Sequence, residues 1–318
     1  MTPSIVAKRV GVYPGPAARS LLARGGSRHI AEAARTMSLA AARDVVFVVG
    51  MGRSGSSALA RLLSFCGGVL PHRLLPANYG NPTGYWEPQD AVELNCRFLN
   101  EHGSSWYDPG LTLQLDPPAL ADRRRFVDEL TDFLVGGFGE GSPLVLKEPR
   151  ISGLLPYWID AATRLGLAPK FVHIVRAPGE VAASLAARDD LSVAHSYALW
   201  LKYNLLAQRH TRGAPRTFVS YEELMSDWEG ALARCFRDVP AGLTISEETC
   251  RHVRAFLTPP QRARSETTRA TGAVDPDVAE LVARAYRAFA AAAAGLLDSS
   301  AFDEIWDDYV AQSVTIRV

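Results

Sequence analysis

The segment GMGRSGSS, residues 50–57, constrains the fold of this chain more than any other. It follows directly on the apolar run Val45–Val49 and leads into the helical pattern Ser56–Phe65. A strand, a glycine-rich turn and a helix start in this order form an anion site, because backbone N–H groups and the positive end of the helix dipole point at one place. The sequence therefore predicts that residues 50–57 bind a phosphate-like group.

The turn is close to a Walker A loop, G-x-x-x-x-G-K-[ST], but its cation stands at a different position. Ser56 occupies the place of the Walker lysine, and Arg53 is the cation of the turn. We therefore expect the turn to hold its anion with a charge arrangement unlike that of an ATPase or a GTPase.

Short apolar runs alternate with helical patterns along the rest of the chain, which predicts an α/β fold. Such alternation favours parallel strands joined by right-handed helical crossovers. We expect a three-layer, P-loop-like parallel sheet flanked by helices on both faces. The expected strands are Val45–Val49, Pro143–Leu146, Phe171–Val175 and Thr217–Val219. The expected helices are Ser56–Phe65, Pro118–Val135, Ile151–Leu165, one starting near Gly179, Ser192–His210, Tyr221–Trp228, Ser246–Phe256 and Asp275–Leu297.

The composition divides the 318 residues into two zones. Residues 1–43 are rich in Ala, Arg, Gly and Ser, with Glu32 as their one acid. We interpret them as an irregular N-terminal arm or a short helix beside the domain, with a transit-type presequence as the alternative. Residues 44–318 show no linker between two cores, so we expect one α/β domain there.

Charge and cysteine content narrow the class of protein. Lys plus Arg and Asp plus Glu each number 34, so no overall charge favours nucleic acid or a membrane surface. The four cysteines are too sparse for a disulfide framework, and no apolar run reaches the roughly 18 residues of a membrane span. We expect a cytoplasmic protein without a nucleic-acid partner or an integral membrane segment; no pattern fixes its oligomeric state.

Cations follow two further predicted strands. Lys147 comes after the run 143–146 and Arg176 after the run 171–175. Ligands of parallel sheets bind beyond the carboxyl ends of the strands, so these cations should join Arg53. An NTPase has an acid at such a strand end to hold Mg²⁺. The pattern predicts a metal-free pocket for a phosphorylated or sulfonated nucleotide, and a P-loop kinase or NTPase with a degenerate turn is the alternative.

A second anion motif begins at Arg176. Ser184 lies eight residues later, two turns into the next predicted helix. The guanidinium group can bind a phosphate with two hydrogen bonds, and the serine hydroxyl can reach the same anion. On its own this pattern is weak, because a strand-terminal arginine is equally often a structural ion-pair partner.

Together the two motifs resemble the sulfotransferases that use 3′-phosphoadenosine 5′-phosphosulfate (PAPS). In that family the glycine turn binds the 5′-phosphosulfate, and an R-x-x-x-x-x-x-x-S segment binds the 3′-phosphate. The resemblance covers about residues 44–265 and is closest to bacterial members that act on hydroxyl groups of carbohydrates, lipids or secondary metabolites. It implies PAPS as donor, 3′,5′-ADP as product and a small-molecule or glycan hydroxyl as acceptor. The supporting segments are NPTGYWEP (81–88), SSWYDP (104–109), LKEPR (146–150), FVSYEEL (218–224) and FLTPPQRAR (256–264).

The resemblance also implies the residues that hold the donor. Arg53 and the amides of Ser54–Ser57 would hold the 5′ end, which Lys147 would reach from the next strand, and Arg176 with Ser184 would hold the 3′-phosphate. The basic residues near 262 would cover the nucleotide, although a solvated charged face is the alternative. The full set is Gly52, Arg53, Ser54, Gly55, Ser56, Ser57, Arg176, Ser184, Arg262 and Arg264, with Arg269 nearby.

Glu87 is the first candidate for the base that deprotonates the acceptor hydroxyl, because it lies in a loop with aromatic neighbours and at a family position where a glutamate is implicated. The alternative is that it caps a helix beginning near Pro88. His102 and His72 are further candidates, whereas His173 lies mid-strand among apolar residues and is interpreted as a core histidine.

Several other residues admit a structural interpretation. Glu148 could pair with Arg150 or orient Lys147, and the helical aromatics Trp200 and Tyr203 fit a hydrophobic core. The segment 71–108 should form much of the acceptor pocket, and a non-catalytic nucleotide-binding protein is a third hypothesis. The aromatic residues of that segment are Tyr79, Tyr85, Trp86, Trp106 and Tyr107, and Tyr221 is expected to pack at its own strand end.

Overall fold

The computed structural model describes residues 43–78, 81–257 and 273–313. The predicted N-terminal arm up to residue 42, Tyr79 and the basic residues Arg262, Arg264 and Arg269 lie outside these ranges.

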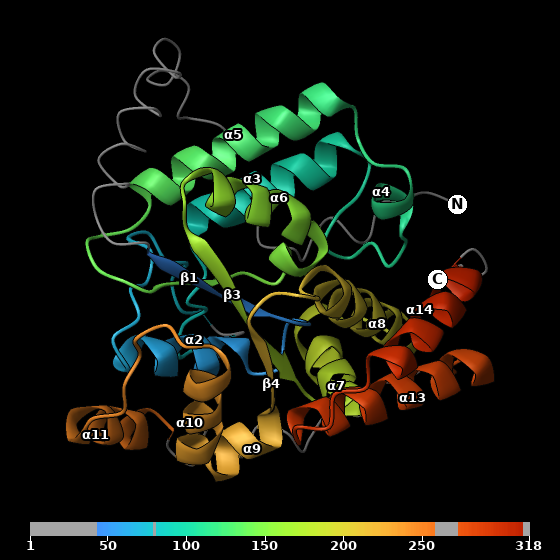
Figure 1. Cartoon of the computed structure of the whole chain (residues 1–318). Coiled ribbons are helices and arrows are strands. Elements are labelled where there is room, and N and C mark those ends of the chain that lie inside the picture. Colours follow the sequence, from blue (N-terminus) through green and yellow to red (C-terminus); the bar gives the residue numbers. More distant parts are fainter. Residues whose placement is uncertain (1–42, 79–80, 258–272, 314–318) are drawn as a thin grey trace.

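The described part of the chain contains a parallel sheet with the strand order β2-β1-β3-β4 (Figure 1). Each of the predicted strands is present, and no strand end differs from the prediction by more than three residues. The α/β fold with a parallel sheet is therefore confirmed. The strands are β1 (Asp44–Val49), β2 (Leu144–Lys147), β3 (Ala168–Val175) and β4 (Arg216–Ser220).

Helices cover both faces of the sheet, as expected (Figure 1). One face carries α3 (Gln89–Glu101), α5 (Leu120–Gly136) and α6 (Ile151–Arg164). The opposite face carries α2 (Ser56–Phe65), α9 (Tyr221–Ser226), α10 (Trp228–Asp238) and α11 (Glu247–Phe256). A third group packs beside β3 and β4 and consists of α7 (Pro178–Asp189), α8 (Val193–His210), α13 (Pro276–Ala293) and α14 (Ser299–Ser313), while α4 (Thr112–Leu115) is a single turn. Among the helices described, none is both long and apolar enough to cross a membrane.

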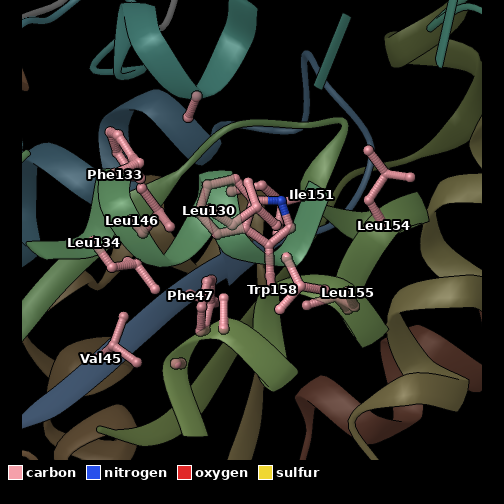
Figure 2. Packing of buried hydrophobic residues seen from close by; sticks show 14 of the residues in the cluster. Val45, Phe47, Leu130, Phe133, Leu134, Leu146, Ile151, Leu154, Leu155 and Trp158 are labelled. Carbon is pink, nitrogen blue, oxygen red and sulfur yellow. The ribbon is translucent and has the colours of Figure 1, made fainter. Parts of the chain in front are cut away.

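Strand β1 supplies side chains to the cores on both faces because successive side chains of a strand point in opposite directions. Val45 and Phe47 pack among the helices α5 and α6 (Figure 2), whereas Val46 packs against α2 on the other face. Phe47 stacks on Phe171 of β3 with the ring centroids 5.5 Å apart, and Trp158 is fully buried beside it. Burying a large apolar side chain contributes roughly 1.5–3 kcal/mol, so these contacts fix β1, and with it the turn that follows.

Two predicted helices differ from the observed ones. The predicted helix 221–228 ends at Ser226, and a separate helix, α10, begins at Trp228, where the side chain of Asp227 accepts a hydrogen bond from the Gly230 amide and caps its start. The predicted helix 275–297 ends at Ala293, and Gly295 follows with a left-handed φ of 86°. A glycine in this conformation commonly ends a helix. The helix α14 has no counterpart in the sequence-based prediction.

The strand order places a crevice between the carboxyl ends of β1 and β3. The chain leaves β1 toward β2 on one side, and it leaves β3 toward β4 on the other. Two neighbouring strands with diverging connections define a topological switch point, where ligands of open α/β sheets bind. Residues 50–55 follow β1 and Arg176 follows β3, so both predicted anion motifs lie at this point.

Candidate functional site

Two side chains hold the start of the glycine turn in place. The amide of Gly50 donates to Ser152 Oγ at 2.9 Å, and the amide of Met51 donates to Asn204 Oδ1 at 3.1 Å. Gly50 has a φ of 127°, and a Cβ atom there would lie 2.6 Å from the carbonyl oxygen of Ile174. A side chain at position 50 would therefore push the turn away from β3.

The middle of the turn presents hydrogen-bond donors that the protein itself leaves open. Arg53 and Gly55 have left-handed φ values of 69° and 92°. Within the described part of the chain, the amides of Arg53, Ser54 and Gly55 meet no acceptor, and neither does the fully buried hydroxyl of Ser54. Buried polar groups are normally hydrogen-bonded, and such donors at the start of α2 match the oxygens of an anion.

The two anion motifs meet in space. Arg53 Nε donates to Ser184 Oγ on α7 at 2.9 Å. Arg176 donates from one terminal nitrogen to the Arg53 carbonyl oxygen at 3.3 Å, and from Nε to Glu180 at 2.6 Å. The side chain of Arg53 therefore points toward α7, although the turn to which it belongs continues into α2. The glycine turn and the Arg176/Ser184 pair form one site.

Arg188 is a further cation of this site that the sequence analysis did not single out. Burial lowers the pKa of Arg53 to about 10, and the positive charge of Arg188 is the second cause, ahead of that of Arg176. Arg188 lies four residues after Ser184 on α7, and residues at this spacing share a helix face. That spacing is the sequence signal that could have identified it.

Tyr221 was expected to pack at its own strand end, but it also contacts both anion motifs. Its ring lies under the guanidinium group of Arg176, with Arg176 Cζ 4.2 Å from the ring centroid. A Cβ atom at Gly55 would lie 2.5 Å from Cδ2 of the same ring. The ring thus fixes the spacing between Arg176 and the end of the glycine turn.

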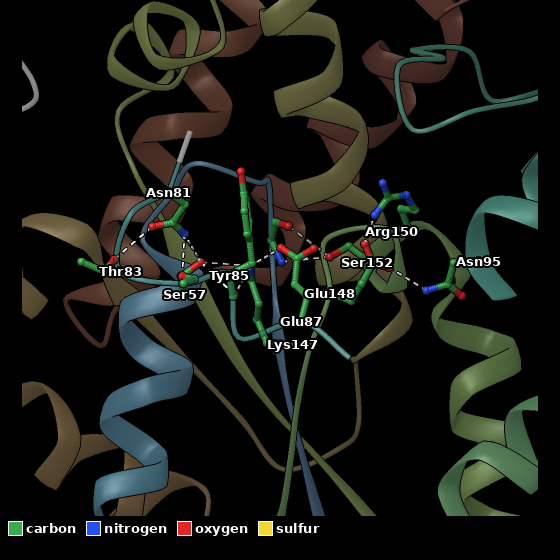
Figure 3. Close-up of polar contacts among 12 residues, drawn as sticks. Ser57, Asn81, Thr83, Tyr85, Glu87, Asn95, Lys147, Glu148, Arg150 and Ser152 are labelled. Carbon is green, nitrogen blue, oxygen red and sulfur yellow. Dashed lines mark hydrogen bonds and ion pairs between the residues drawn. The ribbon is translucent and has the colours of Figure 1, made fainter. Parts of the chain in front are cut away.

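On the other side of the turn, Lys147 is bound by three acceptors (Figure 3). Its ammonium group donates to Glu87 Oε1 at 2.5 Å, and to Ser57 Oγ and the Tyr85 carbonyl oxygen at 3.2 Å each. The side chains of Lys147 and Glu87 are only 3% and 9% exposed. Because an ammonium group has three hydrogens, all donors of Lys147 are in use. The lysine therefore fixes the side chain of Glu87 beside Ser57, in the first turn of α2.

Glu87 does not cap a helix. The helix α3 begins at Gln89 with Pro88 as its N-cap residue, and its start has no side-chain cap. The alternative interpretation of Glu87 is therefore wrong, because the carboxylate turns toward Lys147 instead.

No contact joins any of the three histidines that the sequence analysis weighed to this pair within the described residues. His102 follows the last residue of the 13-residue helix α3, so the helix puts roughly 20 Å between it and Glu87. His72 is exposed, and its amide donates to the Gly137 carbonyl oxygen. His173 is buried, with Nε2 2.9 Å from Thr211 Oγ1, which confirms its interpretation as a core histidine.

A second buried ion pair lies directly beside the first. Glu148 pairs with Arg150, which confirms one of the two interpretations of Glu148, and accepts a hydrogen bond from Asn95 at 2.6 Å. Asn95 in turn accepts from the indole N–H of Trp158 at 3.1 Å. Burial raises the pKa of Glu148, whereas the charge of Arg150 acts in the opposite direction. Each of these four charged groups thus has a partner of opposite charge.

Helix α8 fixes the predicted acceptor segment through three successive carbonyl groups. Tyr203 donates to the Trp106 carbonyl oxygen at 3.0 Å, His195 to that of Tyr107 at 2.5 Å and Lys202 to that of Asp108 at 2.8 Å. Burial lowers the pKa of Lys202 to about 8. The segment therefore has a defined position against α8.

Helix α8 also reaches the other parts of the site. Trp200 donates from its indole nitrogen to the Arg176 carbonyl oxygen at 3.0 Å, and Asn204 binds the turn at Met51. Trp200 and Tyr203 are 0% and 4% exposed, which confirms their interpretation as core residues. Their polar atoms add a positioning role that helical spacing alone does not indicate.

Comparisons with known proteins give remote likenesses of fold. No family model and no curated protein matches the chain. The sulfotransferase domain of the olefin synthase from Synechococcus PCC 7002 is 18% identical, covering 76% of this chain and 94% of that domain, with a TM-score of 0.46. The sulfotransferase domain of the curacin biosynthetic pathway is 15% identical, covering 84% and 98%, with a TM-score of 0.40. A sulfotransferase from Alicyclobacillus acidocaldarius is 16% identical, covering 82% and 99%, with a TM-score of 0.37. Likenesses this remote carry no conclusion about activity.

Proposed function

We propose that this protein is a sulfotransferase that takes the sulfuryl group from PAPS and transfers it to a hydroxyl group. One observation carries the proposal. Arg53, Ser184 and Arg176 meet at the switch point of the sheet, beside the open amides of residues 53–55. Cationic side chains thus lie beside a row of open backbone donors, an arrangement that suits a nucleotide with two separate anionic groups.

The residues present fit the donor. The open amides and the buried Ser54 hydroxyl match the oxygens of the 5′-phosphosulfate, which contains the sulfur–oxygen bond to be broken. Arg176 and Ser184 are assigned to the 3′-phosphate. Because Arg53 belongs to the turn but its guanidinium group lies on Ser184, we place this side chain between the two ends of the donor.

Glu87 is the proposed base. In the transfer, the acceptor oxygen forms a bond to sulfur, the bond from sulfur to the 5′-phosphate oxygen breaks, and the acceptor proton passes to a carboxylate oxygen of Glu87. Lys147 donates to that carboxylate and so fixes its position beside Ser57, at the first turn of α2. Since all three donors of Lys147 are engaged, the ammonium group must exchange one of them before it can stabilise a sulfuryl oxygen.

The acceptor is proposed to be a small molecule or a glycan that binds along the segment 104–109. Trp106 and Tyr107 belong to that segment, and helix α8 fixes their backbone carbonyls. Rigid aromatic side chains can stack on a sugar face or an aromatic ring, so they position a hydroxyl without attracting a charge.

A P-loop kinase or NTPase is not favoured. Such an enzyme holds Mg²⁺ with an acid near the end of a strand. Here β2 ends in Lys147, and the acid that follows, Glu148, is committed to Arg150 and Asn95.

Two measurements test the proposed function. Isothermal titration should show binding of 3′,5′-ADP, and ATP with Mg²⁺ should bind more weakly. Incubation with ³⁵S-labelled PAPS and a panel of phenols, sugars and glycolipids should label an acceptor, also in the presence of EDTA. Binding of ATP with Mg²⁺ but not of 3′,5′-ADP would contradict the proposal. Binding of 3′,5′-ADP without label transfer to any acceptor would instead favour a non-catalytic nucleotide-binding protein.

A further inference from the structure

Arg188 is a nearly buried cation that neither anion motif includes. Its side chain is 21% exposed and lies on α7, one helical turn beyond Ser184. Ser184 receives the hydrogen bond of Arg53, so the guanidinium group of Arg53 lies on the helix face that Arg188 shares. Two guanidinium groups are thus brought together on one face of α7.

The charges around Arg53 are unbalanced in favour of cations. Among the residues that the structure describes, three guanidinium groups, those of Arg53, Arg176 and Arg188, face two carboxylates, those of Glu180 and Asp189. Glu180 pairs with Arg176 and Asp189 with Arg188, so Arg53 has a serine hydroxyl as its hydrogen-bond partner within the described residues. Cations held together away from water repel one another, and an anion among them removes that repulsion.

The anion that these cations would bind could belong to the nucleotide or to the acceptor. The contacts of Arg188 with Asp189 and Trp106 favour the nucleotide. Asp189 accepts from Arg188 at 2.7 Å and from the Tyr107 hydroxyl at 3.5 Å, so its carboxylate links Arg188 to the acceptor segment. The guanidinium group also lies 5.4 Å from the centre of the Trp106 ring. Toward the acceptor segment, Arg188 is therefore lined by a carboxylate and an aromatic ring. Neither group attracts a negatively charged acceptor.

We propose that Arg188 is a third arginine of the donor site and, with Arg53 and Arg176, binds the phosphate monoester on the ribose of the nucleotide. This inference rests on the proposed function and extends it beyond the Arg176/Ser184 pair. A phosphate monoester carries about −1.5 to −2 charges at pH 7, so it matches a site with more guanidinium groups than carboxylates. Arg188 would then select nucleotides that carry this extra phosphate over those that lack it.

The test compares 3′,5′-ADP with 5′-AMP, which lacks the ribose phosphate, by isothermal titration. For R188A, we expect the affinity for 3′,5′-ADP to fall about tenfold or more, the scale of a lost charged hydrogen bond, and that for 5′-AMP to change less than about twofold. R188K keeps the charge but loses the planar fork, so its loss should be intermediate. R287A, which removes an exposed arginine of α13, is the matched control and should leave both affinities unchanged.

A second variant separates binding from folding. R188A leaves Asp189 without its cation, so R188A/D189N is measured as well, together with the melting temperature of each variant without nucleotide. The selective loss of 3′,5′-ADP affinity should persist in the double variant. Unchanged affinity for 3′,5′-ADP, or an equal loss for both nucleotides, would overturn the role of Arg188. Wild-type protein that does not bind 3′,5′-ADP would overturn the proposed function itself.

Discussion

The two sides of the glycine turn differ in how their charges are satisfied. On the α7 side, Arg53, Arg176 and Arg188 outnumber the carboxylates near them in the described part of the chain, and Arg53 has a neutral partner in Ser184. On the β2 side, Lys147 pairs with Glu87 and Arg150 with Glu148, all four largely buried.

Under the proposed function, this difference corresponds to two tasks, donor binding on the α7 side and positioning of the base on the β2 side. A surplus of cations is favourable once an anion arrives, so the α7 side is suited to binding. A closed network of paired charges holds its members in one geometry and costs stability when it is broken, so the β2 side is suited to positioning a base. Variants on the α7 side should therefore change affinity, and those on the β2 side should change turnover or stability.

The largest expected effect is on turnover, in E87Q. The amide cannot accept the acceptor proton, so kcat should fall by roughly 10² to 10⁴-fold, the usual contribution of a general base. The affinity for 3′,5′-ADP should stay near that of the wild type, because Gln can still accept a hydrogen bond from Lys147. Steady-state rates with labelled PAPS measure the first quantity and isothermal titration the second.

The matched control for this variant is E93Q, which changes an exposed glutamate of α3 and should turn over normally. Near-normal turnover of E87Q would show that another residue is the base. The β2 side would then have no role in positioning a base.

K147M should show the largest loss of stability. It leaves the carboxylate of Glu87 buried without a cation, and breaking a buried ion pair in this way costs about 3–5 kcal/mol. Urea unfolding of K147M, E87Q and the double variant E87Q/K147M measures the coupling. The double variant should recover much of the loss; if its destabilisation equals the sum of the two single ones, the pair is not a coupled unit.

R176A should act on affinity and much less on stability. Loss of its charged hydrogen bonds should weaken 3′,5′-ADP binding by about 1.5 kcal/mol or more, roughly tenfold. R164A, on the exposed side of α6, is the control and should bind normally. If R176A bound 3′,5′-ADP as well as the wild type does, the assignment of Arg176 to the nucleotide site would be contradicted.

Y221L should have the smallest effect. The ring under Arg176 contributes about 0.5–1 kcal/mol as a cation–π contact, so its loss should weaken 3′,5′-ADP binding by roughly two- to fivefold. Y221F keeps the ring and should bind as the wild type does. If titration showed an equal loss for both variants, the hydroxyl group would be the relevant part of Tyr221.

The sequence sufficed to predict the parallel sheet and the meeting of the two motifs. Apolar runs followed by helical patterns are local signals, and the carboxyl ends of parallel strands gather at one edge of the sheet. The strand order was not predictable in this way, although it alone places the ends of β1 and β3 side by side.

Contacts between distant segments were the part that local signals missed. The pairing of Glu87 with Lys147 depends on how the loop before α3 folds over β2, and it replaced the helix cap expected from a glutamate near Pro88. In the sequence, Arg188 is one of several arginines in an Ala- and Arg-rich segment, and no motif distinguishes it. Its proposed role follows from the direction of the Arg53 side chain, which points toward Ser184 on the same helix. Residues 258–272 lie outside the described structure, so the cover formed by Arg262 and Arg264 stays a prediction.

The most direct test of the account is a crystal structure of the protein with 3′,5′-ADP. The account predicts the 5′-phosphate at the amides of residues 53–57 and the 3′-phosphate within hydrogen-bonding distance of Arg176 and Ser184. A nucleotide bound elsewhere, for example in the groove between α2 and α11 that Arg61 and His252 line, would contradict it.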